Sequence, residues 1–298
     1  MPDIYRPHLP WYVPKKYFDM FPLDEIRLPQ VFADDTDDLG ARATELITRG
    51  GSYHSHVVKA GKWKEAIQGY LASIAFADAM VGQLLEALQN SQYAANTIVV
   101  IWSDHGWQLG EKGHWRKFAL WENLIRTVLM IRVPSGVATM PQGSASGKVV
   151  TDLTSLLDIY PTLVDLAGLP PRPDLEGTSL RPLLSPGNQS LDRTIITTYD
   201  FADYSARYRK WHYINYVDGS EELYDLSKDP NEWHNLAGLT EFAVTRNRLR
   251  DMLPTDVVPL PESSLIELKE HHVPPVKSRE YYFSRERREW LKRFENIE

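Results

Sequence analysis

The sequence feature that most constrains the fold of this 298-residue chain is an apolar run that ends abruptly in polar residues, within TIVVIWSDHGWQLGEKGHWRK at 97–117. The first six residues of that stretch are β-branched, apolar or aromatic, which predicts a strand covered on both faces. Asp104, His105 and Gly106 follow after one serine, and glycine lets the backbone turn where a side chain would obstruct it. Ligands of open α/β sheets bind at the carboxyl ends of strands, so we expect Asp104 and His105 to hold a metal.

Basic residues follow this pair closely. Lys112, His114, Arg116 and Lys117 all lie within thirteen residues of Asp104, and we expect them to face whatever the pair holds. A metal beside several cations suits a substrate oxyanion such as sulfate or phosphate. An Asp-His pair also occurs commonly in turns and caps, so these residues alone leave a structural role open.

The run SDHGWQLGEKGHWRK, preceded by the helix-like GYLASIAFADAMVGQLLEAL, resembles the second half of a sulfatase of the iduronate-2-sulfatase type. That family belongs to the alkaline-phosphatase-like superfamily of metal-dependent hydrolases. The resemblance therefore implies an α/β fold with a mixed sheet flanked by helices, of which this chain holds a part. It also implies that Asp104 and His105 ligate calcium and that Lys117 holds the sulfate.

Further site residues are implied by the same resemblance. RPHLPW at 6–11 resembles the family motif whose histidine reaches the leaving-group side, so His8 is expected to act as a general acid or as a hydrogen-bond donor to the bridging oxygen. A turn histidine held between two prolines is the alternative. Lys112 and His114 are expected to bind or shape the substrate pocket. Trp107 is expected either as a wall against the sugar or as a packed core residue.

The family nucleophile is absent from the sequence. It is a formylglycine made from the first residue of a Cys/Ser-x-Pro-x-Arg motif, whereas this chain has no cysteine and no such serine motif. The Pro-His-x-Pro motif lies mid-chain in the family but begins near residue 6 here. The chain thus resembles the carboxyl-terminal half of a sulfatase, with the formylglycine expected upstream. Asp104 and His105 alone offer fewer than the about six to eight oxygen ligands that calcium prefers.

The rest of the chain is predicted from periodicity and turn residues. Apolar residues at steps of three and four predict a helix over 62–90, and residues 15–60 read as loop, including a solvated acidic loop at 34–38. The other predicted elements are a strand at 127–133, a helix at 154–167 kinked by Pro161, strands at 194–199, 208–217 and 222–226, and a helix at 240–253.

These elements predict three regions. Residues 1–185 are expected to be part of the catalytic α/β domain, 186–253 a small antiparallel subdomain, and 254–298 a charged tail that forms a terminal helix or frays. The stretch ELYDLSKDPNEWHNLA at 222–237 resembles the sulfatase carboxyl-terminal segment, whose sheet edges the pocket and helps to select the substrate.

Composition limits the partners. A net charge of −7 and a pI of about 5.8 argue against general nucleic-acid binding, and no continuous apolar run approaches the about 18 residues of a membrane span. Residues 1–14 lack the apolar core of a signal peptide. The localisation is therefore undetermined, with the periplasm or secretion expected for a full-length family member.

The expected activity is hydrolysis of the sulfate ester of a sulfated sugar. A phosphatase or phosphodiesterase of the same superfamily is the first alternative, and zinc dependence would distinguish it. An inactive remnant is the second. A half-domain of this kind should expose a sheet edge and an apolar face, so a dimer or a partner chain that completes the sheet is also expected.

Overall fold

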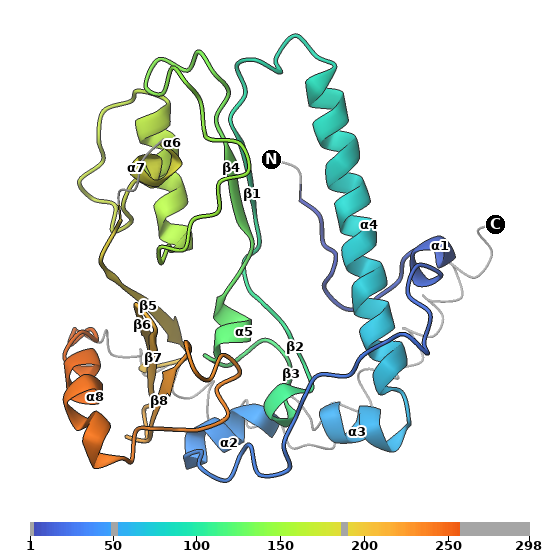
Figure 1. Cartoon of the computed structure of the whole chain (residues 1–298), viewed down its shortest axis with the longest axis vertical. Helices are drawn as coiled ribbons and strands as arrows, with labels where there is room; N and C mark the ends of the chain where they lie inside the picture. The colour runs from blue at the N-terminus through green and yellow to red at the C-terminus, as the bar shows by residue number, and fades with distance from the viewer. Residues whose placement is uncertain (1–2, 49–52, 186–189, 257–298) are drawn as a thin grey trace, which may run out of the picture. The chain divides into compact units, whose positions relative to one another are not determined.

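The fold is described from a computed structural model (Figure 1), which describes residues 3–48, 53–185 and 190–256. The chain divides into two compact units, Met1–Leu253 and Pro254–Glu298. The elements below all belong to the first unit. The predicted helical or frayed tail lies, except for residues 254–256, outside the described residues.

In the described part of the chain, four helices precede the first strand: α1 (Lys15–Phe18), α2 (Ala41–Thr48), α3 (Tyr53–Lys59) and α4 (Trp63–Gln89). The expectation of loop over residues 15–60 therefore holds for residues 19–40 and is wrong where α1, α2 and α3 form. Helices of four to eight residues depend on tertiary packing rather than on propensity, so the sequence carries little signal for them. In α2 that packing buries Ala43 and Leu46 completely.

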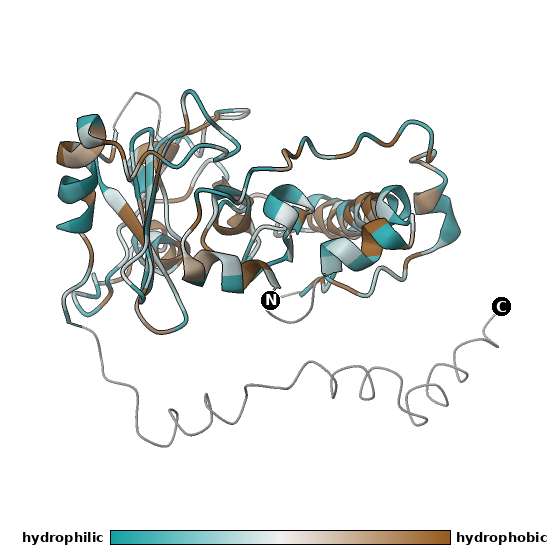
Figure 2. Ribbon diagram, turned by 90° about the horizontal axis from the view of Figure 1, so that it is seen from below, coloured by the Kyte–Doolittle hydropathy of each residue, from teal (hydrophilic) through white to brown (hydrophobic). Residues whose placement is uncertain are grey.

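The long helix α4 confirms the helix expected over 62–90. It buries Ile67 and Ala72 and packs on α1 and α3, but Ile74, Leu84 and Leu85 are each more than a third exposed. In Figure 2, where α4 is seen nearly end on, its ribbon is mostly hydrophobic.

Within the described parts of the chain, α4 is the one helix long and apolar enough to cross a membrane, and only 11% of its most apolar stretch is buried. The sequence analysis found no continuous apolar run of this length, because polar residues such as Asp78 interrupt the apolar residues of α4. A core helix of a globular protein meets the same test.

The expected strand before Asp104 is β1 (Val99–Trp102), which pairs antiparallel with β4 (Leu129–Arg132). The helices α6 (Ile159–Leu166) and α7 (Arg181–Leu184) contribute Leu166 and Leu184 to a hydrophobic cluster with Ile131 of β4. Trp102 is 40% exposed and Met130 59% exposed. The prediction of a strand covered on both faces is thus wrong within the described residues, because there β1 pairs only with β4 and its Trp102 is exposed.

The helix expected at 154–167 is shorter than predicted. A 3-10 turn, Leu156–Asp158, leads into α6, and Ser155 caps the turn by accepting from the Leu157 N–H at 3.3 Å. Pro161 is therefore in the first turn of α6, where backbone N–H groups have no partner within the helix. The predicted kink in a helix interior was wrong for this reason.

The carboxyl-terminal sheet is antiparallel in the order β5-β6-β7-β8, which confirms a small antiparallel sheet. Its strands are Thr194–Tyr199, Asp203–Tyr208, Trp211–Asn215 and Glu221–Asp225, and α8 (Ala243–Arg250) packs beside it. The sequence analysis missed β6 because the turn before it uses Asp200 and Ala202 with positive φ in place of glycine.

Glu222 of β8 lies fully buried beneath this sheet. Its carboxylate accepts hydrogen bonds from Trp121 Nε1 at 2.9 Å, Tyr216 Oη at 2.7 Å and Tyr224 Oη at 2.6 Å. Burial raises the pKa of Glu222, and the three donors only partly oppose that shift. The folded protein therefore holds the Glu222 proton more tightly than the unfolded chain does.

We expect Glu222→Gln to change how stability depends on pH. A raised folded pKa contributes stability that is complete below about pH 4.3, the ordinary glutamate pKa, and that is lost as the pH rises through the folded pKa. The free energy of unfolding of the wild type minus that of the variant should therefore fall between pH 4 and pH 8, measured by urea unfolding. A difference that stays constant or rises would contradict the raised pKa.

Glu65→Gln is the matched control. Glu65 accepts a hydrogen bond from Lys62 at 2.7 Å, which lowers the pKa of its carboxyl. The free energy of unfolding of the wild type minus that of Glu65→Gln should therefore rise, and not fall, as the pH increases.

Candidate active site

The candidate site is built on the chain segment that leaves β1. After Ser103 to Gly106 the chain forms a hairpin of β2 (Gln108–Leu109) and β3 (Trp115–Arg116), joined through the 3-10 turn Glu111–Gly113. The backbone N–H groups of Gly106 and Trp107 donate to the carbonyls of Leu124 and Asn123, both in α5 (Glu122–Ile125), at 2.7 and 3.0 Å. The turn after β1 is therefore fixed by backbone contacts.

Gly106 is required by a close approach of two backbone segments. A Cβ added to Gly106 would lie 2.0 Å from the carbonyl oxygen of Asn123, which is backbone and cannot simply rotate away. We expect Gly106→Ala to lower the free energy of unfolding by about 1–3 kcal/mol, the usual effect of overpacking. Urea unfolding would measure this change.

Gly82→Ala is the control for Gly106→Ala. Gly82 lies inside α4, and an added Cβ would meet no atom within 4 Å. Alanine should stabilise the helix there by about 0.5–1 kcal/mol. Equal stability of the two variants would show that the contact with Asn123 imposes no constraint.

The structure brings five of the predicted site residues together. The ring centroids of His8 and His105 are 6.2 Å apart, and Trp107 lies 5.5 Å from His8 and 6.0 Å from His105. Lys117 Nζ lies 3.0 Å from His105 Nε2, and Asp104 Oδ2 lies 3.7 Å from the same nitrogen. These five residues, which come from positions as far apart as 8 and 117, therefore lie close together in the fold.

The hydrogen bonds of His105 define its tautomer. Its Nδ1 is 2.7 Å from the carbonyl of Gly106, and a carbonyl can only accept, so Nδ1 carries the proton. Nε2 then presents a lone pair, which accepts from Lys117 Nζ. A histidine that ligates a metal usually donates its other ring N–H in this way.

His105 Nε2 and the Asp104 carboxylate suit two ligand positions of a divalent cation, provided that Lys117 releases the Nε2 lone pair when the cation binds. The side chain of Asp104 is 73% exposed and free to approach such an ion. Residues 3–48, 53–185 and 190–256 contain no group of three or more His, Cys, Asp or Glu side chains that could hold a metal ion. A complete coordination shell needs further ligands.

His8 is held by its neighbours in the amino-terminal segment. Its Nδ1 donates to the carbonyl of Leu9 at 2.8 Å, and Tyr5 Oη donates to the same carbonyl at 2.7 Å. Nε2 is thereby the ring nitrogen available to a substrate. A proton on that atom would make His8 a hydrogen-bond donor or an acid.

Lys112 lies apart from this group. It is 2% exposed, and its ammonium donates to Asp35 Oδ1 at 2.9 Å and to the carbonyl of Glu232. The rings of Trp121 and Tyr224 lie 5.8 and 5.4 Å from it. The expectation that Lys112 faces the Asp-His pair is corrected, because the left-handed backbone at Lys112 (φ 51°) and its buried partner carboxylate direct it into the protein interior.

His114 is also buried, and it acts on the backbone of the site. Burial lowers the pKa of His114, which favours the neutral ring, and its Nε2 donates to the carbonyl of Lys117 at 3.0 Å. His114 therefore fixes the backbone of Lys117. His114 thus shapes the loop from the protein interior, and its own side chain is not exposed to solvent.

Two residues that anchor the hairpin were not recognised from the sequence. Asp35, expected in a solvated loop, is buried against Lys112, and burial raises its pKa although Lys112 opposes the shift. Glu232 accepts from the Glu122 N–H at 2.8 Å and contacts His212, whose Nε2 lies 2.6 Å from Ser205 Oγ. The sequence feature that could have identified Glu232 is the Asp-Pro-x-Glu segment that ends at this residue.

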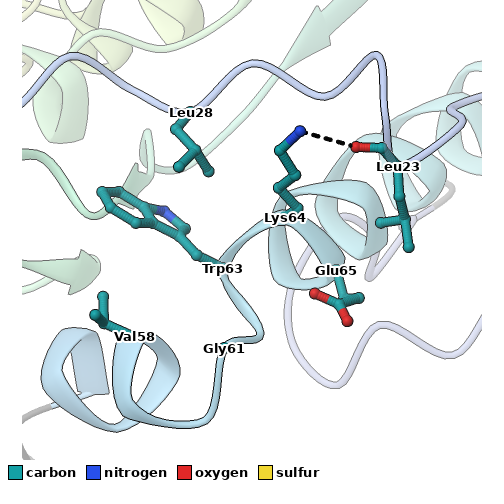
Figure 3. A pocket seen from close by; sticks show the side chains of 7 residues that line it. All are labelled: Leu23, Leu28, Val58, Gly61, Trp63, Lys64 and Glu65. Atoms are coloured by element: carbon teal, nitrogen blue, oxygen red, sulfur yellow. Dashed lines mark hydrogen bonds between the residues drawn. The ribbon is translucent and has the colours of Figure 1, made fainter.

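A separate pocket of about 420 Å3 lies between the loop at 23–28 and the start of α4 (Figure 3). Trp63 and Leu28 line it, and Lys64 donates to the carbonyl of Leu23 at 3.2 Å. His8, Asp104 and Lys117 are not among its lining residues. We therefore place the candidate active site at the end of β1 and not in this pocket.

Comparison with known proteins adds the family context. Residues 5–169 match the family described as Sulfatase, and residues 110–257 match the family described as N-sulphoglucosamine sulphohydrolase, C-terminal. A sulfatase of Formosa agariphila is 39% identical over 252 residues, which are 84% of this chain and 48% of that protein. The chain spans about half the length of the curated relatives it matches.

Solved structures support the same fold. A protein in complex with its substrate D-glucosamine-2-N,6-O-disulfate aligns with a TM-score of 0.67 at 22% identity, over 83% of this chain and 62% of its own. A phosphonate monoester hydrolase of Agrobacterium radiobacter aligns with a TM-score of 0.70 at 25% identity, over 90% of this chain and 56% of its own. These likenesses confirm the alkaline-phosphatase-like α/β fold.

The relatives differ in what their names say they act on. They include choline-sulfatase, N-acetylglucosamine-6-O-sulfatase and iduronate 2-sulfatase. The broad expectation of a sulfatase resemblance is confirmed. The comparisons do not single out the iduronate-2-sulfatase type.

Proposed function

Because the chain belongs to the sulfatase family, a family of sulfuric ester hydrolases, we propose that it supplies the sulfate-binding and leaving-group side of an active site that hydrolyses sulfated sugars. The observation that carries this proposal is the convergence of His8, Asp104, His105 and Lys117 at the end of β1. Names of relatives that act on sulfated sugars support the substrate class.

Each residue has a distinct role in the proposed reaction. Lys117 binds the non-bridging sulfate oxygens and stabilises the negative charge that develops there. His8 presents Nε2 to the bridging oxygen and, when protonated, donates to the departing alcohol. Trp107, stacked at 6.0 Å on Tyr70 of α4, forms the wall against the sugar.

Asp104 and His105 are proposed to supply two ligands of a divalent cation, with calcium as the family expectation. Such a cation, when bound, neutralises charge on the sulfate oxygens. The formylglycine nucleophile would come from polypeptide outside these 298 residues, since the sequence lacks the nucleophile motif. The remaining metal ligands would come from there too, since the described residues place no third ligand beside Asp104 and His105. The activity of the whole protein is therefore part of the proposal.

Apolar residues exposed on α4 and on the β1–β4 sheet support the proposal that another polypeptide segment packs on them and completes the fold. Leu84 and Leu85 of α4 are 46% and 38% exposed, and Trp102 and Met130 lie exposed on the β1–β4 sheet. A two-stranded sheet is marginally stable by itself, and exposed apolar area marks a contact surface. We propose that a partner chain, a second copy or an in-frame upstream segment covers them.

Sulfate release tests the proposed function. The gene product extended in frame upstream of the Met1 codon would be assayed beside the 298-residue chain alone, on glucosamine 6-O-sulfate and an aryl sulfate. We expect hydrolysis only by the extended protein. Turnover of phosphate or phosphonate esters with no sulfate release would favour the phosphohydrolase alternative, and silence on all esters would favour an inactive remnant.

A further inference from the structure

The backbone on both sides of Lys117 has an unusual conformation. Arg116 and Phe118 have φ angles of 80° and 84°, in the left-handed region that favours glycine. Such a conformation is unfavourable for a residue with a side chain and persists where the surroundings hold it in place, often at a ligand clamp. The side chain of Phe118 is nevertheless 40% exposed, so burial of its own ring does not explain the conformation.

The Arg116 guanidinium is fixed, and it has no acidic partner among the residues that the structure describes. Its Cζ lies 5.3 Å from the ring centroid of Tyr53 and 5.6 Å from that of Phe118, and Nη1 donates to Tyr53 Oη at 3.1 Å. Its Nε is buried without an acceptor. No ion pair joins Arg116 to a carboxylate of residues 3–48, 53–185 or 190–256, whereas Arg42 and Arg207 there are both paired.

An arginine in this state retains binding capacity. Guanidinium carries five N–H donors in a planar fork, which matches a carboxylate or sulfate in a bidentate manner. Tyr53 accepts from one of these donors, and it is unfavourable to leave another buried N–H without an acceptor. An anionic ligand would relieve that cost.

The Phe118 ring also locates Arg116 relative to the sulfate-binding lysine. The centroid of the Phe118 ring lies 5.5 Å from Lys117 Nζ and 5.6 Å from Arg116 Cζ. Tyr199 of β5 lies 6.4 Å from Phe118 and extends the aromatic surface. Two cations and an aromatic wall therefore occupy one side of the candidate site.

We propose that Arg116 binds a second anionic group of the substrate, a carboxylate or another sulfate, while Lys117 holds the sulfate to be cleaved. This inference rests on the proposed function and narrows its substrate class to sulfated sugars with at least two anionic groups. Tyr53 positions the guanidinium, and Phe118 separates the two anion sites.

Titration calorimetry on the 298-residue chain at fixed low salt tests the proposal. The three ligands are glucosamine 6-O-sulfate, glucosamine 2-N,6-O-disulfate and a monosulfated hexuronic acid. We expect at least one dianionic sugar to bind about tenfold more tightly than the monosulfated one. The disulfated and uronic acid arms distinguish a second sulfate from a carboxylate.

Variants assign that preference to Arg116. In Arg116→Gln the ratio of dianionic to monosulfated affinity should fall to near one, and in Arg116→Lys, which keeps the charge but not the fork, it should fall partway. Tyr53→Phe removes the hydroxyl that fixes the guanidinium and should also lower the ratio. Thermal melts confirm that each variant is folded.

Arg27→Gln is the matched control, since Arg27 is exposed and the change in net charge is the same. A ratio that falls equally in Arg27→Gln, or that is near one in the wild type, would overturn the role of Arg116 and leave the proposed function standing. If none of the three sugars binds and, in addition, Lys117→Ala leaves sulfate release by the extended protein unchanged, the proposed function fails as well.

Discussion

Replacing Lys112 by methionine should lower the free energy of unfolding by about 3–5 kcal/mol, the usual cost of leaving a buried charge without its partner. Lys112 and Asp35 have side chains that are only 2% and 3% exposed, and they form an ion pair at 2.9 Å. Without Lys112, Asp35 must stay charged in a buried site or take up a proton. Urea unfolding at pH 7 measures the loss.

The pH dependence of this loss has a defined sign. Burial already raises the pKa of Asp35, and removing Lys112 raises it further because the ammonium opposes that shift. The deficit of Lys112→Met relative to the wild type should therefore shrink as the pH falls towards 4, where the variant holds Asp35 protonated.

Two further variants separate the ion pair from general packing. The double variant Lys112→Met/Asp35→Leu should recover much of the loss, since an apolar pair often replaces a buried ion pair without cost. Lys210→Met breaks the pair with Asp225, in which the lysine side chain is 45% exposed, and should cost about 1 kcal/mol or less. A loss below about 1 kcal/mol for Lys112→Met would show that the hairpin does not depend on this anchor.

Replacing Lys117 by alanine should reduce sulfate release by the complete enzyme about 100- to 1000-fold, the usual effect of removing one donor that stabilises developing oxyanion charge. Lys117 Nζ lies 3.0 Å from His105 Nε2, at the point where His8 and Trp107 converge. The loss should appear in kcat/KM with folding unchanged, because Lys117 is not part of the buried core.

Lys228→Ala provides the control for that experiment, since Lys228 is exposed in the turn after β8. It should leave sulfate release near the wild-type rate. If Lys117→Ala behaves in the same way, Lys117 does not hold the sulfate.

The sequence predicted the elements whose signal is local. The stripe of α4, the apolar run of β1 and the strand β5 are each encoded within their own residues, and β5 was predicted at its exact bounds, Thr194–Tyr199. The short helices α2 and α3 were missed because contacts with distant residues stabilise them. His54 belongs to the stretch 15–60 that was read as loop, but it lies in α3 and accepts a hydrogen bond from Trp115 Nε1 at 3.0 Å.

From the sequence alone, the position of a site residue could be predicted only where a motif comes just after a predicted strand. Asp104 and His105 follow β1 after one serine, so their place at the strand end could be deduced from sequence alone. Lys112 and Lys117 are both lysines of one hairpin, and no local pattern distinguishes the buried one from the one beside His105. That difference depends on Asp35, which lies 77 residues away in the chain. The roles of these residues in catalysis remain predictions.

The anchors of the hairpin also determine when the site can form during folding. Lys112 is bonded to Asp35, 77 residues before it, and to the Glu232 carbonyl, 120 residues after it. Both closures carry a large loop entropy, which must be overcome before their contacts contribute. During synthesis from the amino terminus, a nascent chain that has not yet passed Glu232 therefore lacks one of the two anchors, and the segment bearing Lys117 settles only after most of the molecule has been made.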